Sequence, residues 1–80
     1  MQLNRSVLIV EDEEVIRTSL AEFLTSEGYE TMQASTVARA LELARDRDFN
    51  VAICDVQLPD GDGIELLRRL QNIKPSFFFF

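Results

Sequence analysis

The sequence contains two short, fully apolar runs that each stop at a carboxylate. Residues 7–10 (Val-Leu-Ile-Val) lead directly into Glu11 and Asp12. Residues 51–54 (Val-Ala-Ile-Cys) lead directly into Asp55. Continuous apolar runs of this length, rich in β-branched residues, are typical of strands that are buried on both faces of a parallel sheet. The two runs therefore predict a sheet covered by helices on both sides, with acidic groups at the ends of two strands.

The segment after the first run has the periodicity of a helix. Its apolar residues recur at spacings of three and four, which is typical of one buried helix face. Asp12 is expected to cap this helix at its N-terminus, and Gly28 is expected to end it. The predicted buried stripe consists of four apolar residues, Ile16, Leu20, Phe23 and Leu24.

A second strand and a second helix follow. Residues 29–34 alternate in a pattern whose polarity indicates an edge strand. Ser35 or Thr36 is then expected to cap a helix that runs to about Arg47. The predicted buried stripe of this helix is Val37, Ala40, Leu41 and Ala44.

A third helix is expected after the second apolar run, from about Gly63 to Asn72. The residues between them, 56–63, contain proline and glycine and read as a turn region. Asp60 and Asp62 are predicted to be turn and N-cap residues in front of the third helix. The apolar side of that helix is expected to consist of Ile64, Leu66, Leu67, Leu70 and Ile73.

The order of these elements is strand, helix, strand, helix, strand, helix. Alternation of this kind builds an α/β fold in which parallel strands are joined by right-handed crossovers. Ligands of open parallel sheets bind at the carboxyl ends of the strands, near the point where the strand order reverses. If the first and third strands are neighbours, the candidate site is the place where these two strands end.

Composition and charge exclude several classes of function. The chain has 14 acidic and 8 basic residues and a net charge of -6, which argues against direct binding of nucleic acid by this segment. Its single cysteine, Cys54, cannot form an internal disulfide and is expected to be a small buried hydrophobe. No signal peptide and no apolar run of about 20 residues is present, so we expect a cytoplasmic protein with no membrane partner.

The acidic residues at the two strand ends are the candidate site. If the first and third strands are adjacent, Glu11, Asp12 and Asp55 converge on one place. Converging carboxylates repel one another and raise each other's pKa, so the cluster is a poor device for stability. Its natural complement is a hard divalent cation with oxygen ligands, for which Mg²⁺ is the expected choice.

Such a site can carry out phosphoryl chemistry. Mg²⁺ usually takes one or two protein carboxylates and a phosphate oxygen, which leaves a third carboxylate available as a nucleophile. A carboxylate oxygen can attack phosphorus and form an aspartyl phosphate, while the metal screens the negative charges that meet there. Asp55, at the end of the second apolar run, is the expected nucleophile.

Two segments of the sequence resemble response-regulator receiver domains. Residues 7–13 resemble the first strand and acidic pair of that family. Residues 55–63 resemble its phosphorylation loop, in which the Asp is followed four residues later by Pro59 and eight residues later by Gly63. Residues 58–63 are also similar to receivers of enhancer-dependent transcription activators. The resemblance implies a flavodoxin-like three-layer fold with strand order 2-1-3-(4).

The resemblance also implies roles for individual residues. Asp55 corresponds to the phosphoacceptor, and Asp12 to the carboxylate that binds Mg²⁺ directly. Glu11 corresponds to the neighbour that reaches the metal through water, and the main-chain carbonyl of Gln57 to a further ligand beside Asp55. The implied partner is a histidine kinase or a small phosphodonor, and the family also catalyses its own dephosphorylation.

The sequence departs from the family at its C-terminal end. Receivers have five strands, with a Ser or Thr after the fourth and a Lys after the fifth, and this sequence stops before both. We therefore expect residues 1–80 to form a partial receiver domain, recognisable over 6–75, with weakened chemistry and no transmitted switch. The Phe-rich end, 76–80, is either the start of a short fourth strand or an altered end of the sequence.

Three other functions are alternatives to a phosphoacceptor signalling module. A structural or self-associating fragment would keep the fold without the activity, pairing with a second copy through an exposed sheet edge or helix faces. A phosphatase of the haloacid-dehalogenase type would need a second Asp two residues after Asp55, where Gln57 stands. A flavin-binding role lacks a phosphate-cradling loop, because residues 11–14 are all acidic. The expected enzymatic activity is at most weak self-phosphorylation and dephosphorylation.

Overall fold

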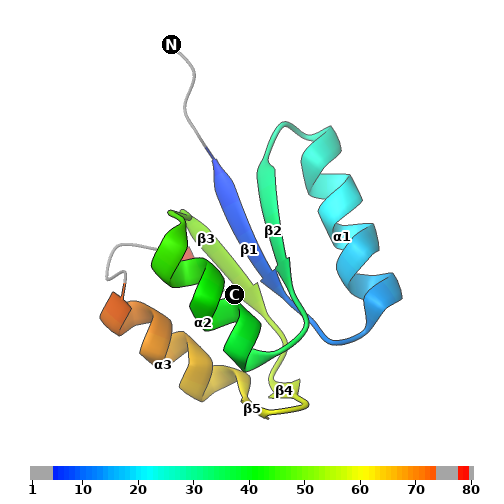
Figure 1. The fold of residues 1–80 in the computed structure, drawn as a ribbon. Helices are drawn as coiled ribbons and strands as arrows, with labels where there is room; N and C mark the ends of the chain where they lie inside the picture. The colour runs from blue at the N-terminus through cyan, green and yellow to red at the C-terminus, as the bar shows by residue number, and fades with distance from the viewer. Residues whose placement is uncertain (1–4, 74–77, 80) are drawn as a thin grey trace.

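The computed structural model describes residues 5–73 and the backbone of residues 78 and 79 (Figure 1). The central sheet has four parallel strands, β1 (Ser6–Val10), β2 (Glu30–Ala34), β3 (Val51–Cys54) and β6 (Phe78–Phe79). Its helices are α1 (Glu14–Ser26), α2 (Val37–Asp46) and α3 (Gly63–Ile73). A small antiparallel hairpin, β4 (Gln57–Leu58) with β5 (Gly61–Asp62), lies between β3 and α3.

The strand order in the sheet is β2-β1-β3-β6. Val7 of β1 pairs with Thr31 of β2 on one side and with Val51 of β3 on the other, so β1 lies between its two neighbours. This order confirms the predicted α/β fold with β2 at the edge and at most a short fourth strand. It also makes β1 and β3 adjacent, which is the condition that the candidate site requires.

The sheet is covered on both faces, by α1 on one side and by α2 and α3 on the other (Figure 1). Leu8 and Val10 of β1 pack in the core with α2 and α3, whereas Val7 and Ile9 pack on the side of α1. All four side chains are buried. The alternation of side chains along a strand explains the continuous apolar run, because both faces of β1 meet a helix.

Two of the four residues predicted to form the buried stripe of α1 are exposed, so the prediction is wrong for these two. Leu20 and Leu24 are half-buried and pack against the sheet beside the buried Ala21. Ile16 and Phe23 are 52% and 60% exposed, so they lie away from the sheet. The spacing of apolar residues allowed either rotation of the helix. The small Ala21 side chain permits close approach to the sheet, which turns the larger Phe23 outward.

The helix ends agree with the prediction in part. Gly28 follows α1 with a φ of 95°, a left-handed conformation that suits glycine, and Thr36 caps α2 by accepting a hydrogen bond from the Arg39 amide at 3.1 Å. The predicted capping role of Asp12 is wrong. The N-cap of α1 is Glu13, which makes no side-chain capping bond.

Asp60 and Asp62 cap different helices. Asp62 accepts a hydrogen bond from the Ile64 amide at 2.7 Å, in front of α3 as predicted. Asp60 was predicted in the same role, but its two carboxylate oxygens accept from the amides of Val37 (2.7 Å) and Ala38 (3.1 Å) in the first turn of α2. The hairpin after β3 places Asp60 beside the start of α2. The sequence near Asp60 does not predict this contact, because the two segments are far apart in the chain. The hydrogen bond from the Val37 amide is the largest cause and lowers the pKa of Asp60. Burial opposes it, and the hydrogen bond from the Ala38 amide adds to the lowering, so the pKa stays below its ordinary value.

Replacing Asp60 with alanine should lower the midpoint of thermal unfolding by about 5 °C at neutral pH, because two amides at the start of α2 lose their acceptor. Since the pKa of Asp60 is lowered in the folded state, its contribution is complete above the ordinary value of 3.8 and is lost as the pH falls below it. The difference between the two proteins should therefore shrink in acid. Thermal unfolding followed by circular dichroism between pH 2.5 and 7 measures this.

The matched control is Asp46→Ala, at the exposed C-terminal end of α2. An aspartate there is unfavourable to the helix dipole, so its removal should leave the midpoint unchanged or slightly raised. An equal loss of stability in both variants would contradict the capping role of Asp60.

None of the three helices in the described part of the chain has the length and hydropathy that a bilayer-spanning helix requires.

Candidate functional site

The site lies where β1 and β3 end. Glu11 and Asp12 follow β1, and Asp55 follows β3. The Asp55 amide donates to the Val10 carbonyl at 2.9 Å, and the Glu11 amide donates to the Ala34 carbonyl at 3.0 Å. The hydrogen-bond ladder of the sheet therefore continues one residue past both strands, and it holds the backbone of the acidic residues in register.

The structure brings the three predicted carboxylates together. One oxygen each of Glu11, Asp12 and Asp55 lies within 4.8 Å of the others. Glu11 and Asp55 are half-buried, and Asp12 is exposed. Asp12 and Asp55 also line a surface hollow of about 520 Å³ with Gln57, so the residue predicted to offer a main-chain carbonyl borders the same space. We call Glu11, Asp12 and Asp55 the acidic pocket.

Backbone amides orient two of these carboxylates. The Glu13 amide donates to Oε2 of Glu11 at 3.1 Å, and the Val56 amide donates to Oδ1 of Asp55 at 2.8 Å. The second oxygen of Asp55 makes no such bond among the described residues. Asp55 is thus held by one oxygen while the other is available at the pocket.

The charges of the acidic pocket repel one another. The hydrogen bond from the Glu13 amide lowers the pKa of Glu11, but burial and the negative charges of Asp55 and Asp12 together outweigh it. The pKa of Glu11 is therefore raised above its ordinary value of 4.5. In the described part of the chain, no basic side chain forms an ion pair with Glu11, Asp12 or Asp55. A bound cation would relieve this repulsion.

The donor set fits a hard divalent cation. Carboxylate oxygens are the ligands that Mg²⁺ and Ca²⁺ prefer, and the mutual repulsion of three of them is the electrostatic complement of such an ion. Glu11, Asp12 and Asp55 are the residues that could hold it.

Cys54 is adjacent to the pocket but inert. Its half-buried side chain packs against the core, and Sγ donates to the Asp55 carbonyl at 3.2 Å. Burial, followed by the negative charges of Asp55, Glu11 and Asp62, raises its pKa to about 11. The thiol therefore stays protonated at neutral pH and acts as the small hydrophobe that was predicted.

Gly63 is packed directly against the backbone of Asp55. Its amide donates to the Val56 carbonyl at 2.7 Å, and a Cβ atom at this position would overlap the main-chain carbonyl of Asp55. Gly63 is the last residue of the segment that resembles the phosphorylation loop. A residue without a side chain is needed there because the first residue of α3 closely approaches the Asp55 backbone.

Arg17 was missed in the sequence. Its guanidinium lies against the backbone of Glu11, because a side chain in the first turn of α1 leans back toward the loop that precedes the helix. The available signal was its place five residues after the acidic pair, on the helix that follows β1.

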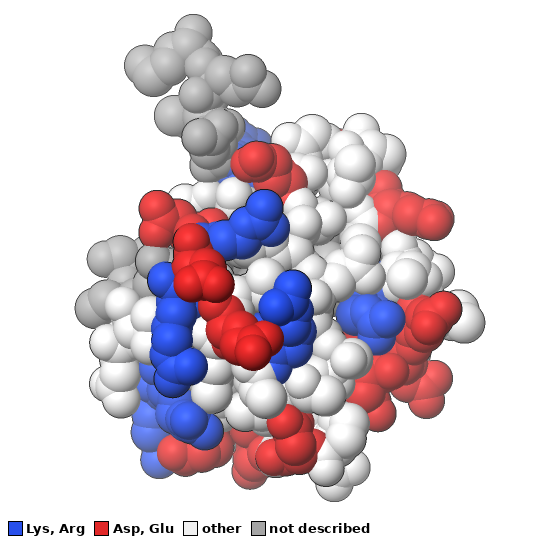
Figure 2. Space-filling view, viewed as in Figure 1, with Lys and Arg blue, Asp and Glu red and all other residues white. Residues whose placement is uncertain are grey.

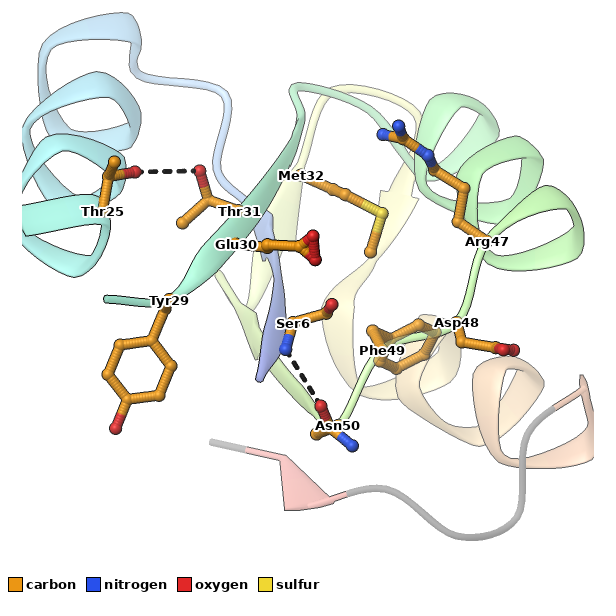
Figure 3. Close-up of a pocket in the computed structure, with 10 residues that line it drawn as sticks. All are labelled: Ser6, Thr25, Tyr29, Glu30, Thr31, Met32, Arg47, Asp48, Phe49 and Asn50. Atoms are coloured by element: carbon orange, nitrogen blue, oxygen red, sulfur yellow. Dashed lines mark hydrogen bonds between the residues drawn. The ribbon is translucent and has the colours of Figure 1, made fainter. Parts of the chain in front are cut away.

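A second surface hollow, of about 680 Å³, lies at the opposite end of the sheet (Figure 3). Its lining includes Ser6 and Glu30, which begin β1 and β2, and Asn50, which precedes β3. Figure 3 shows the Ser6 amide donating to Oδ1 of Asn50, at 2.9 Å, which ties these strand starts together. Because ligands of parallel sheets bind at the carboxyl ends of strands, we do not assign the functional site to this hollow.

The visible face over α2 and α3 carries acidic and basic side chains interleaved (Figure 2). Two arginines of these helices are paired, Arg39 with Glu42 in α2 and Arg68 with Glu65 in α3. This face shows no continuous basic surface of the kind that binds a phosphate backbone.

Most of the chain matches a known protein family. Residues 7–78 match the response regulator receiver domain family, and the chain belongs to that family. Among curated relatives, it is 37% identical over 71 residues to sporulation initiation phosphotransferase F of Bacillus subtilis (strain 168). That match covers 89% of this chain and 57% of the relative, so the chain spans little more than half of the relative's length.

Solved structures of receiver domains have the same fold as this chain. A CheY-like receiver domain protein from Methanospirillum hungatei JF-1 superposes with a TM-score of 0.93 at 34% identity, over 96% of this chain and 62% of the other. A response regulator from Burkholderia pseudomallei, solved with a phosphorylated aspartic acid, a calcium ion and citrate, superposes with a TM-score of 0.91 at 29% identity. This match covers 95% of our chain and 45% of the other. The protein is thus a receiver domain of two-component signalling with the flavodoxin-like fold. As predicted, its sheet consists of three longer strands and a short fourth strand.

Proposed function

We propose that Asp55 is the phosphoacceptor of this receiver domain and that the acidic pocket binds Mg²⁺. The observation that carries the proposal is the convergence of Glu11, Asp12 and Asp55, within 4.8 Å, at the ends of adjacent strands. A receiver of the same fold has been solved with a phosphorylated aspartic acid and a calcium ion, which supports a phosphorylated carboxylate and a hard cation in a receiver domain.

The proposed reaction is a phosphoryl transfer to a carboxylate oxygen. The oxygen of Asp55 that is not bonded to the Val56 amide attacks phosphorus, and a new P–O bond forms. The bond from phosphorus to the donor breaks and its electron pair leaves with the donor, which is a histidine nitrogen of a kinase or acetate from acetyl phosphate. The product is a mixed anhydride at Asp55, which water later hydrolyses.

The other residues of the pocket prepare Asp55 for this reaction. We assign Asp12, Asp55 and the main-chain carbonyl of Gln57 as direct ligands of Mg²⁺ and Glu11 as a ligand through water. When bound, Mg²⁺ screens the negative charges of the carboxylates and the incoming phosphoryl group. The Val56 amide fixes one oxygen of Asp55, so the attacking oxygen is oriented before the donor arrives.

A histidine kinase or a small phosphodonor is the proposed source of the phosphoryl group, and a cytoplasmic location is part of the same proposal. The alternative is a structural module that associates with a second copy. Large apolar side chains on the surface favour this alternative, because association with a second copy would remove them from water. Val15, Phe23 and Val56 are each more than half exposed.

Incubation with Mg²⁺ and acetyl phosphate tests the proposal. Intact-mass measurement should show one added phosphoryl group that is lost in acid, and the adduct should be absent from Asp55→Asn. Circular dichroism checks that both proteins are folded. A folded wild-type chain without adduct would contradict the proposed function and favour the structural alternative, and an adduct that persists in Asp55→Asn would place the acceptor elsewhere.

A further inference from the structure

Arg17 connects α1, the loop after β1 and the edge strand β2. Its Nη1 donates to the main-chain carbonyl of Glu11 at 3.0 Å, and its Nε donates to Oε1 of Gln33 at 3.3 Å. Arg17 is half-buried, and Gln33 lies one residue before the C-terminal end of β2. One planar guanidinium therefore spans the end of β2 and the first residue of the acidic pocket.

The partners of Arg17 are neutral although Arg17 follows an acidic stretch of the chain. Residues 11–14 are all acidic, yet no ion pair joins Arg17 to any of them in the described part of the chain. A cation in the first turn of a helix also opposes the helix dipole. Both facts indicate that the side chain acts through the geometry of its donor groups rather than through its charge.

The carbonyl that Arg17 holds belongs to the peptide between Glu11 and Asp12. This peptide is planar, so fixing the carbonyl direction also fixes the direction in which the Asp12 backbone leaves it. The Glu11 amide is held on its other side by the Ala34 carbonyl at 3.0 Å. The backbone of the acidic pair is therefore clamped between β2 and α1.

We propose that Arg17 is a positioning residue for the acidic pocket, which it serves by holding the Glu11 carbonyl while Gln33 holds its guanidinium. The role rests on the proposed function in so far as the pocket binds Mg²⁺. The clamp on the backbone is itself a property of the metal-free protein. Arg17 touches neither the phosphoryl group nor the metal in this assignment.

Charge and geometry make opposite predictions for Mg²⁺ affinity, which makes the proposal testable. Removing a positive charge beside the pocket should strengthen the binding of a dication if charge alone matters. Losing the clamp should weaken it, as outer-shell partners of metal ligands commonly do by a factor of ten or more. We expect Arg17→Met to weaken Mg²⁺ binding about tenfold, and Gln33→Ala about threefold, by isothermal titration calorimetry at pH 7.

Arg17→Lys separates the two effects further. Lysine keeps the charge but has one compact donor in place of the planar fork, so it should recover part of the affinity that methionine loses. The matched control is Arg68→Met, at an exposed arginine of α3 that pairs with Glu65, and its affinity should equal that of the wild type.

A second readout needs no metal. In the metal-free protein, exchange of the Glu11 amide hydrogen with solvent should be about tenfold faster in Arg17→Met, whereas the Leu8 amide in the middle of β1 should be unchanged. A merely global loss of stability would accelerate both amides.

An Arg17→Met protein that is folded, binds Mg²⁺ as tightly as the wild type or more tightly, and protects Glu11 normally would overturn the proposal. If Arg17→Met does not fold, Gln33→Ala and Arg17→Lys carry the same test. If the wild type binds no Mg²⁺, the proposed function fails, and the exchange rate of the Glu11 amide alone decides the role of Arg17, with faster exchange supporting it and unchanged exchange overturning it.

Discussion

Replacement of Gly63 by alanine should reduce the free energy of unfolding by about 3 kcal/mol, the upper range for inserting a group into a packed interior. The new Cβ would overlap the Asp55 carbonyl oxygen, and it would also crowd the Asp55 carbonyl carbon (2.9 Å) and Cα of Val56 (3.1 Å). These are backbone atoms, which cannot turn aside as a side chain can. Either α3 must move away from β3 or the loop after Asp55 must shift, so we also expect the proposed phosphorylation of Asp55 to be impaired. Urea denaturation with matched wild-type data measures the loss.

Two other glycines serve as controls for this prediction. At Gly61 a Cβ would lie 3.1 Å from Cγ2 of Val37, a side-chain atom that can give way, so Gly61→Ala should cost less than about 1 kcal/mol. At Gly28 a Cβ has open space, and the cost is the strain of a φ of 95°, about 1–2 kcal/mol. The prediction is wrong if Gly63→Ala is as stable as Gly61→Ala.

Neutralising a member of the acidic pocket should have opposite effects with and without Mg²⁺. In the metal-free protein, Asp12→Asn and Glu11→Gln each remove a like charge from the pocket and should raise the midpoint of thermal unfolding. In the presence of Mg²⁺ the same changes remove a ligand, so affinity should fall at least tenfold for Asp12→Asn, the proposed direct ligand, and less for Glu11→Gln. Thermal unfolding at several Mg²⁺ concentrations measures both effects, because a ligand of the native state raises its stability.

The stability of the metal-free protein should decrease as the pH rises through the pKa of Glu11. The pKa of Glu11 is raised in the folded protein, so the native state holds a proton that the unfolded chain releases near pH 4.5. The resulting stabilisation of the metal-free protein is complete below this pH and is lost as the pH rises through the raised value. Mg²⁺ competes with the same proton, so its affinity should increase over that interval, and Glu11→Gln should remove both dependences.

An acidic residue outside the pocket provides the control. Glu22 is exposed on α1, and Glu22→Gln should leave the Mg²⁺ affinity and the pH dependence as in the wild type. If Glu22→Gln and Asp12→Asn weaken Mg²⁺ binding equally, the ion responds to the general negative charge of the chain rather than to a site.

The two central strands and the parallel arrangement of the sheet are predictable from local sequence, because apolar runs and helical periodicity are properties of consecutive residues. Residues 7–10 and 51–54 are apolar at every position, which requires cover on both faces, and alternation with helical segments requires parallel crossovers. The proximity of Glu11, Asp12 and Asp55 then follows from the adjacency of two strands. The resemblance to receiver domains added the roles of these residues, which remain predictions until the phosphoryl group and the metal are measured.

Contacts between distant segments are decided only by the tertiary structure. Asp60 caps α2, which begins 23 positions earlier in the chain, because the hairpin after β3 folds over the start of that helix. Apolar spacing did not choose between the possible rotations of α1, and Phe23 lies outward because close packing on the sheet occurs at Ala21.

In the acidic pocket, too, some features can be predicted from local sequence and others are visible only in the folded chain. Consecutive residues are enough to predict which carboxylates end the two strands, because apolar runs and charges are local features of the sequence. The need for a glycine at position 63 and the contact of Arg17 with the Glu11 carbonyl are visible only in the folded chain, because both depend on distances between backbone segments that are separate in the sequence. Asp55 could thus be found by reading the chain, whereas the groups that hold its surroundings in place had to be found in space.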